Sequence, residues 1–172
     1  MNWEAIAAVG QIVGATAVVS TLIYLALQIR YAKLSAADTN RLARAQGVRE
    51  YFLQAATNRE LRIANTKALG LDDYYETIAK EIGVTADEAS ILDHCYSYWF
   101  WLHWGQFTST TEKKDLDELG NMVRAFYTLP PVRVSWDRSP TVKPLLDPPF
   151  VKFVEDILRD WDKSAEGGGE RS

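Results

Sequence analysis

The sequence predicts an all-α protein in which a single N-terminal transmembrane helix continues into a soluble helical bundle. Residues 5–29 contain no charged side chain, and this run is longer than the roughly 20 apolar residues that a helix needs to cross a bilayer. Further along, apolar residues recur at helical spacing between capping signals. We therefore divide the chain into an anchor with its interfacial flanks (1–33), a helical cytoplasmic domain (34–163) and a flexible tail (164–172).

The apolar run is expected to remain in the membrane rather than to be cleaved as a signal peptide. A signal peptide starts with basic residues and has an apolar core of about 7–15 residues, whereas this chain has Glu4 and no Lys or Arg before its longer run. Basic residues follow the run at Arg30, Lys33, Arg41 and Arg44. Because such residues stay in the cytoplasm, we expect a single-pass protein of the cell inner membrane with its N-terminus outside and its C-terminal domain in the cytoplasm.

One face of the anchor carries the small residues Ala7, Gly10, Gly14 and Ala17. Small residues allow the backbone of a second helix to approach closely, as in GxxxG pairs. We expect bilayer lipid around this helix, and an integral-membrane protein or a second copy of the chain against its small-residue face. Gly is also common in membrane helices generally, so the pattern leaves the alternative of no partner open.

Three capping boxes are expected to open helices after the anchor helix, which should continue to about Ala56. In a capping box, a Ser or Thr oxygen accepts from the backbone N–H three positions later, and a Glu at that position reaches back to the first residue. The three pairs are Thr57 with Glu60, Thr85 with Glu88, and Ser109 with Glu112.

Glycine and proline residues predict where the helices end. Gly70 and Gly83 are expected to close two short helices. Pro130–Pro131 should stop a longer helix, after which a short helical turn inserts Trp136 into the core. The prolines between residues 140 and 149 predict an ordered connector. A last helix follows, on which one apolar face is formed by Phe150, Phe153, Val154, Ile157, Leu158 and Trp161.

The segment from Ala86 to Phe107 is expected to be the central helix of the bundle. No Asp, Glu, Lys or Arg occurs from His94 to Thr111, and aromatic residues occur on all sides of this helix. A helix that is apolar all round is buried in a core or in a membrane, and the histidines, Ser97 and Gln106 argue against a second span. The alternative is contact with the membrane surface, a partner or a ligand. The candidate residues for such a surface are His94, Tyr98, Trp101, His103 and Trp104.

No residue pattern indicates catalysis, a metal or a cofactor. His94, Cys95 and His103 are the only His and Cys residues, and a structural zinc site needs four ligands at short spacings. Cys95 is expected to be a small core residue, since a nucleophilic thiol needs exposure beside a base. The common phosphate, dinucleotide, zinc-protease and hydrolase signatures are absent. A net charge of −4 disfavours nucleic acid, so we expect a protein that is not an enzyme.

Short motifs along the chain form a recognisable pattern. They are Trp3–Ile6, Gly10, Gly14, Leu22–Ala26, Gln28–Arg30, Asn58–Leu61, Thr85 with Glu88, Arg133 with Trp136, and Phe150–Val154. This pattern resembles a large group of uncharacterised bacterial proteins with one N-terminal transmembrane helix and a small helical cytoplasmic domain. That group often has two adjacent tryptophans where this chain has Ser135–Trp136. The resemblance implies a fold and a topology, and no activity.

These features favour a membrane-anchored, non-enzymatic interaction or accessory subunit of a larger membrane protein assembly. The alternative is a membrane-tethered ligand-binding or sensory module. Its aromatic-lined pocket would lie between the aromatic helix and the last helix. A large apolar cavity that reaches His94 or His103 would favour this alternative, and a solid core there would count against it.

Overall fold

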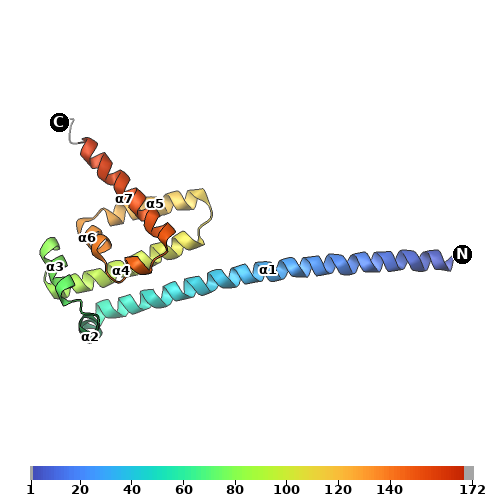
Figure 1. The fold of residues 1–172 in the computed structure, drawn as a ribbon, viewed down its shortest axis with the longest axis horizontal. Coiled ribbons are helices and arrows are strands. Elements are labelled where there is room, and N and C mark those ends of the chain that lie inside the picture. The colour runs from blue at the N-terminus through green and yellow to red at the C-terminus, as the bar shows by residue number, and fades with distance from the viewer. Residues whose placement is uncertain (1, 169–172) are drawn as a thin grey trace. The chain divides into compact units, whose positions relative to one another are not determined.

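The chain is an all-α protein, and the computed structural model describes residues 2–168. No strand occurs among these residues, so the predicted fold class is confirmed. The elements are α1 (Trp3–Thr57), α2 (Arg59–Leu69), α3 (Asp72–Ile82), α4 (Ala86–Ser109), α5 (Lys113–Tyr127), α6 (Pro130–Arg138), the 3-10 helix η1 (Lys143–Leu145) and α7 (Pro148–Gly168) (Figure 1). The flexible tail was expected over residues 164–172; α7 continues to Gly168, and residues 169–172 lie outside the described part of the chain.

The chain divides into two units, Met1–Arg41 and Leu42–Ser172. Helix α1 contributes to both units, and it runs without interruption to Thr57, as the lack of proline predicted. In the first unit, α1 is long and apolar enough to cross a membrane, and none of its most apolar stretch is buried. The apolar core helix of a water-soluble protein would be mostly covered, whereas a signal sequence would look the same.

Helix α4 forms the centre of the second unit. It contacts α3, α5, α6 and α7 (Figure 1). The predicted capping box starts it: the Thr85 hydroxyl accepts from the Glu88 backbone N–H at 3.3 Å, and the Thr85 N–H donates to the Glu88 carboxylate at 2.9 Å. Buried residues cover more than half of the circumference of α4, including Phe100 and Trp104 of the main core, whereas Trp99 on the other side is 43% exposed.

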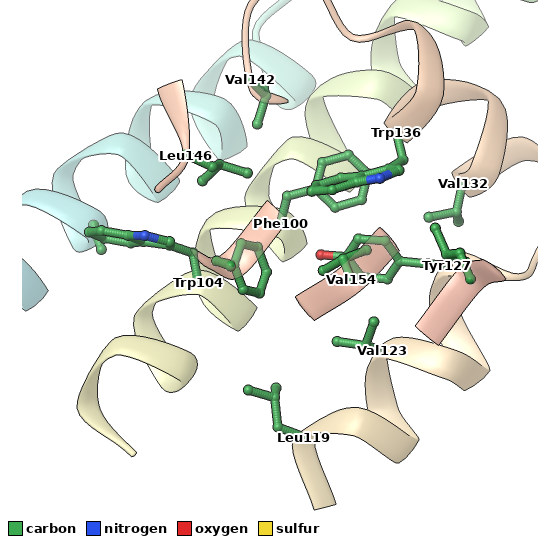
Figure 2. Packing of buried hydrophobic residues seen from close by; sticks show 13 residues of the cluster. Phe100, Trp104, Leu119, Val123, Tyr127, Val132, Trp136, Val142, Leu146 and Val154 are labelled. Carbon is green, nitrogen blue, oxygen red and sulfur yellow. The ribbon is translucent and has the colours of Figure 1, made fainter. Parts of the chain in front are cut away.

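Trp136 of α6 fills the middle of the main core. Its side chain is fully buried, and its ring centroid lies 5.2 Å from that of Phe100 and 5.1 Å from that of Tyr127. Figure 2 shows these rings together, with residues from α4, α5, α6 and α7 around them. The short helix that inserts Trp136 is thus confirmed, and α6 begins at the two prolines that stop the preceding helix.

Glycine ends two helices as predicted. Gly70 follows α2 with φ of 64°, and Gly83 follows α3 with φ of 75°. These angles lie in the left-handed region, which costs glycine little because it has no Cβ. The N–H groups of both glycines donate to carbonyls in the last turn of the helix before them.

Two of the three predicted capping boxes are wrong. The Thr57 hydroxyl donates to the Leu53 carbonyl at 2.9 Å, so Thr57 is the last residue of α1, and Asn58 caps α2 instead. The Ser109 hydroxyl likewise donates to the Gly105 carbonyl at 2.9 Å within α4. In both cases the hydroxyl is already bonded to the helix that ends there.

We expect Trp136→Ala to destabilise the second unit by about 3–5 kcal/mol, because it leaves a large cavity that the surrounding rings cannot fill. Trp161→Ala is the matched control, since this side chain is 45% exposed and its loss should cost less than about 0.5 kcal/mol. Urea unfolding of the full chain in detergent, followed by far-UV circular dichroism, measures both. Equal losses in the two variants would contradict the assigned core.

Candidate functional site

An apolar cavity of about 780 Å³ that is open to solvent lies in the second unit beside His94. Pockets of this size hold small-molecule ligands. Four parts of the chain surround it: the last turns of α1, the α2–α3 pair, α4, and the connector before α7. The lining residues are Gly47, Val48, Tyr51, Phe52, Asn65, Leu69, Leu71, Tyr75, Asp93, His94, Trp101, Pro140, Thr141, Pro144 and Leu145.

The helical repeat of α4 brings its cavity residues to one side. His94 and Trp101 are seven residues apart, which is about two turns, so they lie one above the other on the same face. Asp93 is adjacent to His94 and borders the same space. The aromatic run therefore contributes one of its faces to the cavity and its other faces to the main core.

Two buried residues hold the connector in place as the outer wall. Val142 and Leu146 insert into the main core, where they are 0% and 5% exposed. The Val142 N–H also donates to the Ser139 hydroxyl at 3.0 Å. With these positions fixed, Pro140 and Pro144 border the cavity, and their rings restrict the backbone of the wall.

Aromatic rings follow one another along the cavity. The ring centroids of Tyr51 and Phe52 are 5.5 Å apart, those of Phe52 and His94 are 6.0 Å apart, and those of Tyr75 and His94 are 6.3 Å apart. The His94 Nδ1 lies 2.6 Å from the carbonyl oxygen of Ser90. Because a carbonyl only accepts, the His94 Nδ1 carries a proton and donates it to Ser90.

Asp93 is a buried carboxyl group that hydroxyl groups surround. Its Oδ1 accepts from the Ser135 hydroxyl at 2.5 Å and from the Tyr74 hydroxyl at 3.0 Å, and its Oδ2 accepts from the Tyr75 hydroxyl at 3.5 Å. Burial raises the pKa of Asp93, although these hydroxyls and the nearby His94 oppose the shift. Burial beside Asp93 also raises the pKa values of Tyr74 and Tyr75, so both phenols stay protonated.

No Lys or Arg forms an ion pair with Asp93 among the described side chains. The ion pairs found there involve other acidic residues. Two donors that border the cavity also lack partners within the described residues: the Asn65 amide nitrogen and the Trp101 indole nitrogen. Buried polar groups of this kind are usually satisfied, so the cavity combines apolar walls with unused polar capacity.

The structure separates the five residues that the sequence singled out as a ligand or partner surface. His94 and Trp101 line the cavity together. Tyr98 lies elsewhere, with the Arg49 guanidinium 5.8 Å from its ring centroid. Trp104 belongs to the main core and is 7% exposed. His103 is also buried, on another side of α4.

His103 packs against α5 rather than the cavity. Its Nδ1 lies 3.4 Å from the Tyr127 hydroxyl, and its ring is 5.9 Å from that of Phe126. Burial lowers the pKa of His103 from 6.5 to about 4. This imidazole therefore stays neutral at physiological pH and acts as a core residue.

The expected location of a pocket, between α4 and α7, is filled by aromatic side chains. The ring of Phe107 lies 5.5 Å from that of Phe150 and 5.1 Å from that of Phe153. The cavity instead lies where α1, α3 and the connector meet α4. Cys95 gives no sign of an activated nucleophile, because burial raises the pKa of its thiol.

The small-residue face of α1 lies in the first unit, apart from these side chains. Ala7, Gly10, Gly14 and Ala17 are all exposed. A Cβ added at Gly10 or Gly14 would meet no other atom within 4 Å. The described part of the chain therefore leaves this face uncovered.

Sequence reasoning missed most of the cavity. Asp93 had one usable signal, since it is the last acidic residue before the charge-free run. No sequence signal indicated Tyr51, Asn65 or Tyr75. These residues come together only when the three helices that carry them pack against α4.

No protein-family model, curated protein or solved structure matches this chain. Its class is therefore described by its own structure. It is an all-α protein with an uncovered apolar N-terminal helix and a helical unit that contains an apolar cavity. The resemblance to bacterial single-span proteins stays an expectation.

Titration of His103 should make the second unit sensitive to acid. Its folded pKa of about 4 lies below the unfolded value of 6.5, so the neutral ring stabilises the fold above pH 6.5, and this contribution is lost as the pH falls toward 4. Between about pH 7 and pH 4, the wild type should lose about 3 kcal/mol more than His103→Phe. Urea unfolding across this range gives the difference, and parallel pH profiles for the two proteins would contradict the burial of His103.

Proposed function

We propose that this chain is a single-pass protein of the bacterial inner membrane. Its helical unit would lie in the cytoplasm and act as an interaction or accessory subunit of a larger membrane assembly, without catalysing a reaction. Basic residues after the apolar run, including Arg30 and Lys33, support the cytoplasmic position of this unit. The protonated thiol of Cys95 and the neutral core position of His103 agree with a role in binding.

The observation that carries this proposal is the uncovered apolar helix α1. None of its most apolar stretch is buried by the described chain, and exposed apolar surface of this length is unstable in water. Lipid would cover most of it. The face formed by Ala7, Gly10, Gly14 and Ala17 offers the close backbone approach by which helices associate in a bilayer, where packing rather than the hydrophobic effect drives association.

The cavity beside His94 favours a second candidate function, a membrane-tethered ligand-binding or sensory module. Its volume of about 780 Å³ suits a small molecule. The two functions are compatible, because the helix face lies in the first unit and the cavity lies in the second.

Replacing both Gly10 and Gly14 with Ile should release the partner or the second copy from this chain. The added side chains would hold the helices apart, whereas the helical unit would stay folded because nothing contacts these positions. Blue-native electrophoresis of gently solubilised native membranes measures the assembly, with a shift of most of the protein to the size of the free chain as the expected result.

Ala8→Ile with Ala15→Ile is the matched control. At 100° per residue these positions lie about 130° around α1 from the centre of the small-residue face, so the variant adds similar bulk away from that face. It should keep the large species. A wild-type protein that migrates only as a free monomer would sink the proposal, as would equal release by the two double variants.

A further inference from the structure

We propose that the cavity beside His94 binds an apolar organic cation, with its amine or ammonium nitrogen held by Asp93 and the surrounding aromatic rings. This inference rests on the second proposed function, ligand binding in the helical unit, and names the class of ligand.

Asp93 supplies the acceptor. Its Oδ1 already accepts two hydroxyl bonds, whereas its Oδ2 accepts a single long one from Tyr75 at 3.5 Å. A carboxylate oxygen has room for two good donors, so Oδ2 keeps capacity for an N–H donor or a positive charge.

The aromatic walls suit the same charge. The faces of Tyr and Trp attract cations within about 6 Å of the ring centre, and cages of such rings recognise ammonium groups. Tyr51, Tyr75 and Trp101 all border the cavity with Asp93. The walls can thus bind both the apolar body and the charged end of one molecule.

His94 is the one basic residue among the lining residues. No Lys or Arg lines the cavity, and no described ion pair involves Asp93. An anionic ligand would meet a buried carboxyl group without a compensating Lys or Arg, which is costly. A cationic ligand would complete the pair, and the volume of about 780 Å³ leaves room for an apolar body larger than one ring.

The competing ligand class is a neutral molecule with an acceptor oxygen. The partnerless Asn65 amide and Trp101 indole would favour it. The carboxyl group of Asp93, the aromatic rings and the lack of Lys and Arg among the lining residues favour a cationic ligand more strongly than these two donors favour a neutral one. The experiment compares both classes directly.

Equilibrium dialysis of the full chain in phosphatidylcholine nanodiscs tests the inference with two probes of nearly equal shape. Naphthylmethylamine is cationic at about pH 7, and naphthylmethanol is its neutral counterpart. Gly47→Trp serves as the blocked form, because a Cβ at Gly47 meets no atom within 4 Å and the indole would occupy cavity space. Leu53→Trp places the same indole on the opposite side of α1, at a position that is 52% exposed and does not line the cavity. Binding that Gly47→Trp removes and Leu53→Trp keeps is binding in the cavity.

We expect the wild type to bind the amine at least tenfold more tightly than the alcohol. Asp93→Asn keeps an oxygen for Ser135 and Tyr74 while removing the carboxyl group that can ionise against a bound cation, so it should weaken amine binding at least tenfold and leave alcohol binding unchanged. Retained alcohol binding also shows that this variant is folded. If the variant does not fold, the ratio of the two affinities in the wild type decides alone.

Equal affinities for the two probes, tighter binding of the alcohol, or full amine binding by Asp93→Asn would overturn the cation proposal. In those cases the ligand-binding function would stand, since the cavity would still bind one or both probes. If neither probe shows binding that Gly47→Trp removes, the ligand-binding function itself fails, and the cation proposal fails with it.

Discussion

The second unit depends on covering a helix that has no polar face. From His94 to the end of α4 no side chain carries a charge that could solvate one side of the helix, so every side needs a neighbour. Helices α3, α5, α6 and α7 cover most of α4, and Trp99 stays 43% exposed. The fully buried Trp136 closes the middle of this arrangement, and the paired prolines at the start of α6 set where that indole enters.

One side of α4 borders the cavity, which is open to solvent. The connector, with Val142 and Leu146 anchored in the core, forms another wall of this cavity. Asp93 links α4 to α3 through Tyr74 and to α6 through Ser135. The residue proposed to hold a ligand therefore also positions the walls around that ligand. A change of charge at Asp93 would act on both the ligand and the packing of these helices.

Local signals in the sequence predicted helices better than they predicted contacts. The charge-free run located α4, and glycine and proline located most helix ends. Three similar capping signals were present, yet only Thr85 forms its box, because Thr57 and Ser109 are bonded to the helices that end with them. For the candidate site, the sequence identified His94 and Trp101 from their place in α4. Asn65, Tyr75 and the connector come from distant segments, and only tertiary packing brings them together.

Helix α4 is the core helix of the helical unit. Amide hydrogen exchange of the full chain, resolved by peptide, can measure how well α4 is protected. We predict that amides in the middle of α4, around Phe100, exchange most slowly in the second unit, because they open only when the whole unit unfolds. The mostly exposed α2 should exchange much faster. Exchange of the middle of α4 at the rate of α2 would contradict the account.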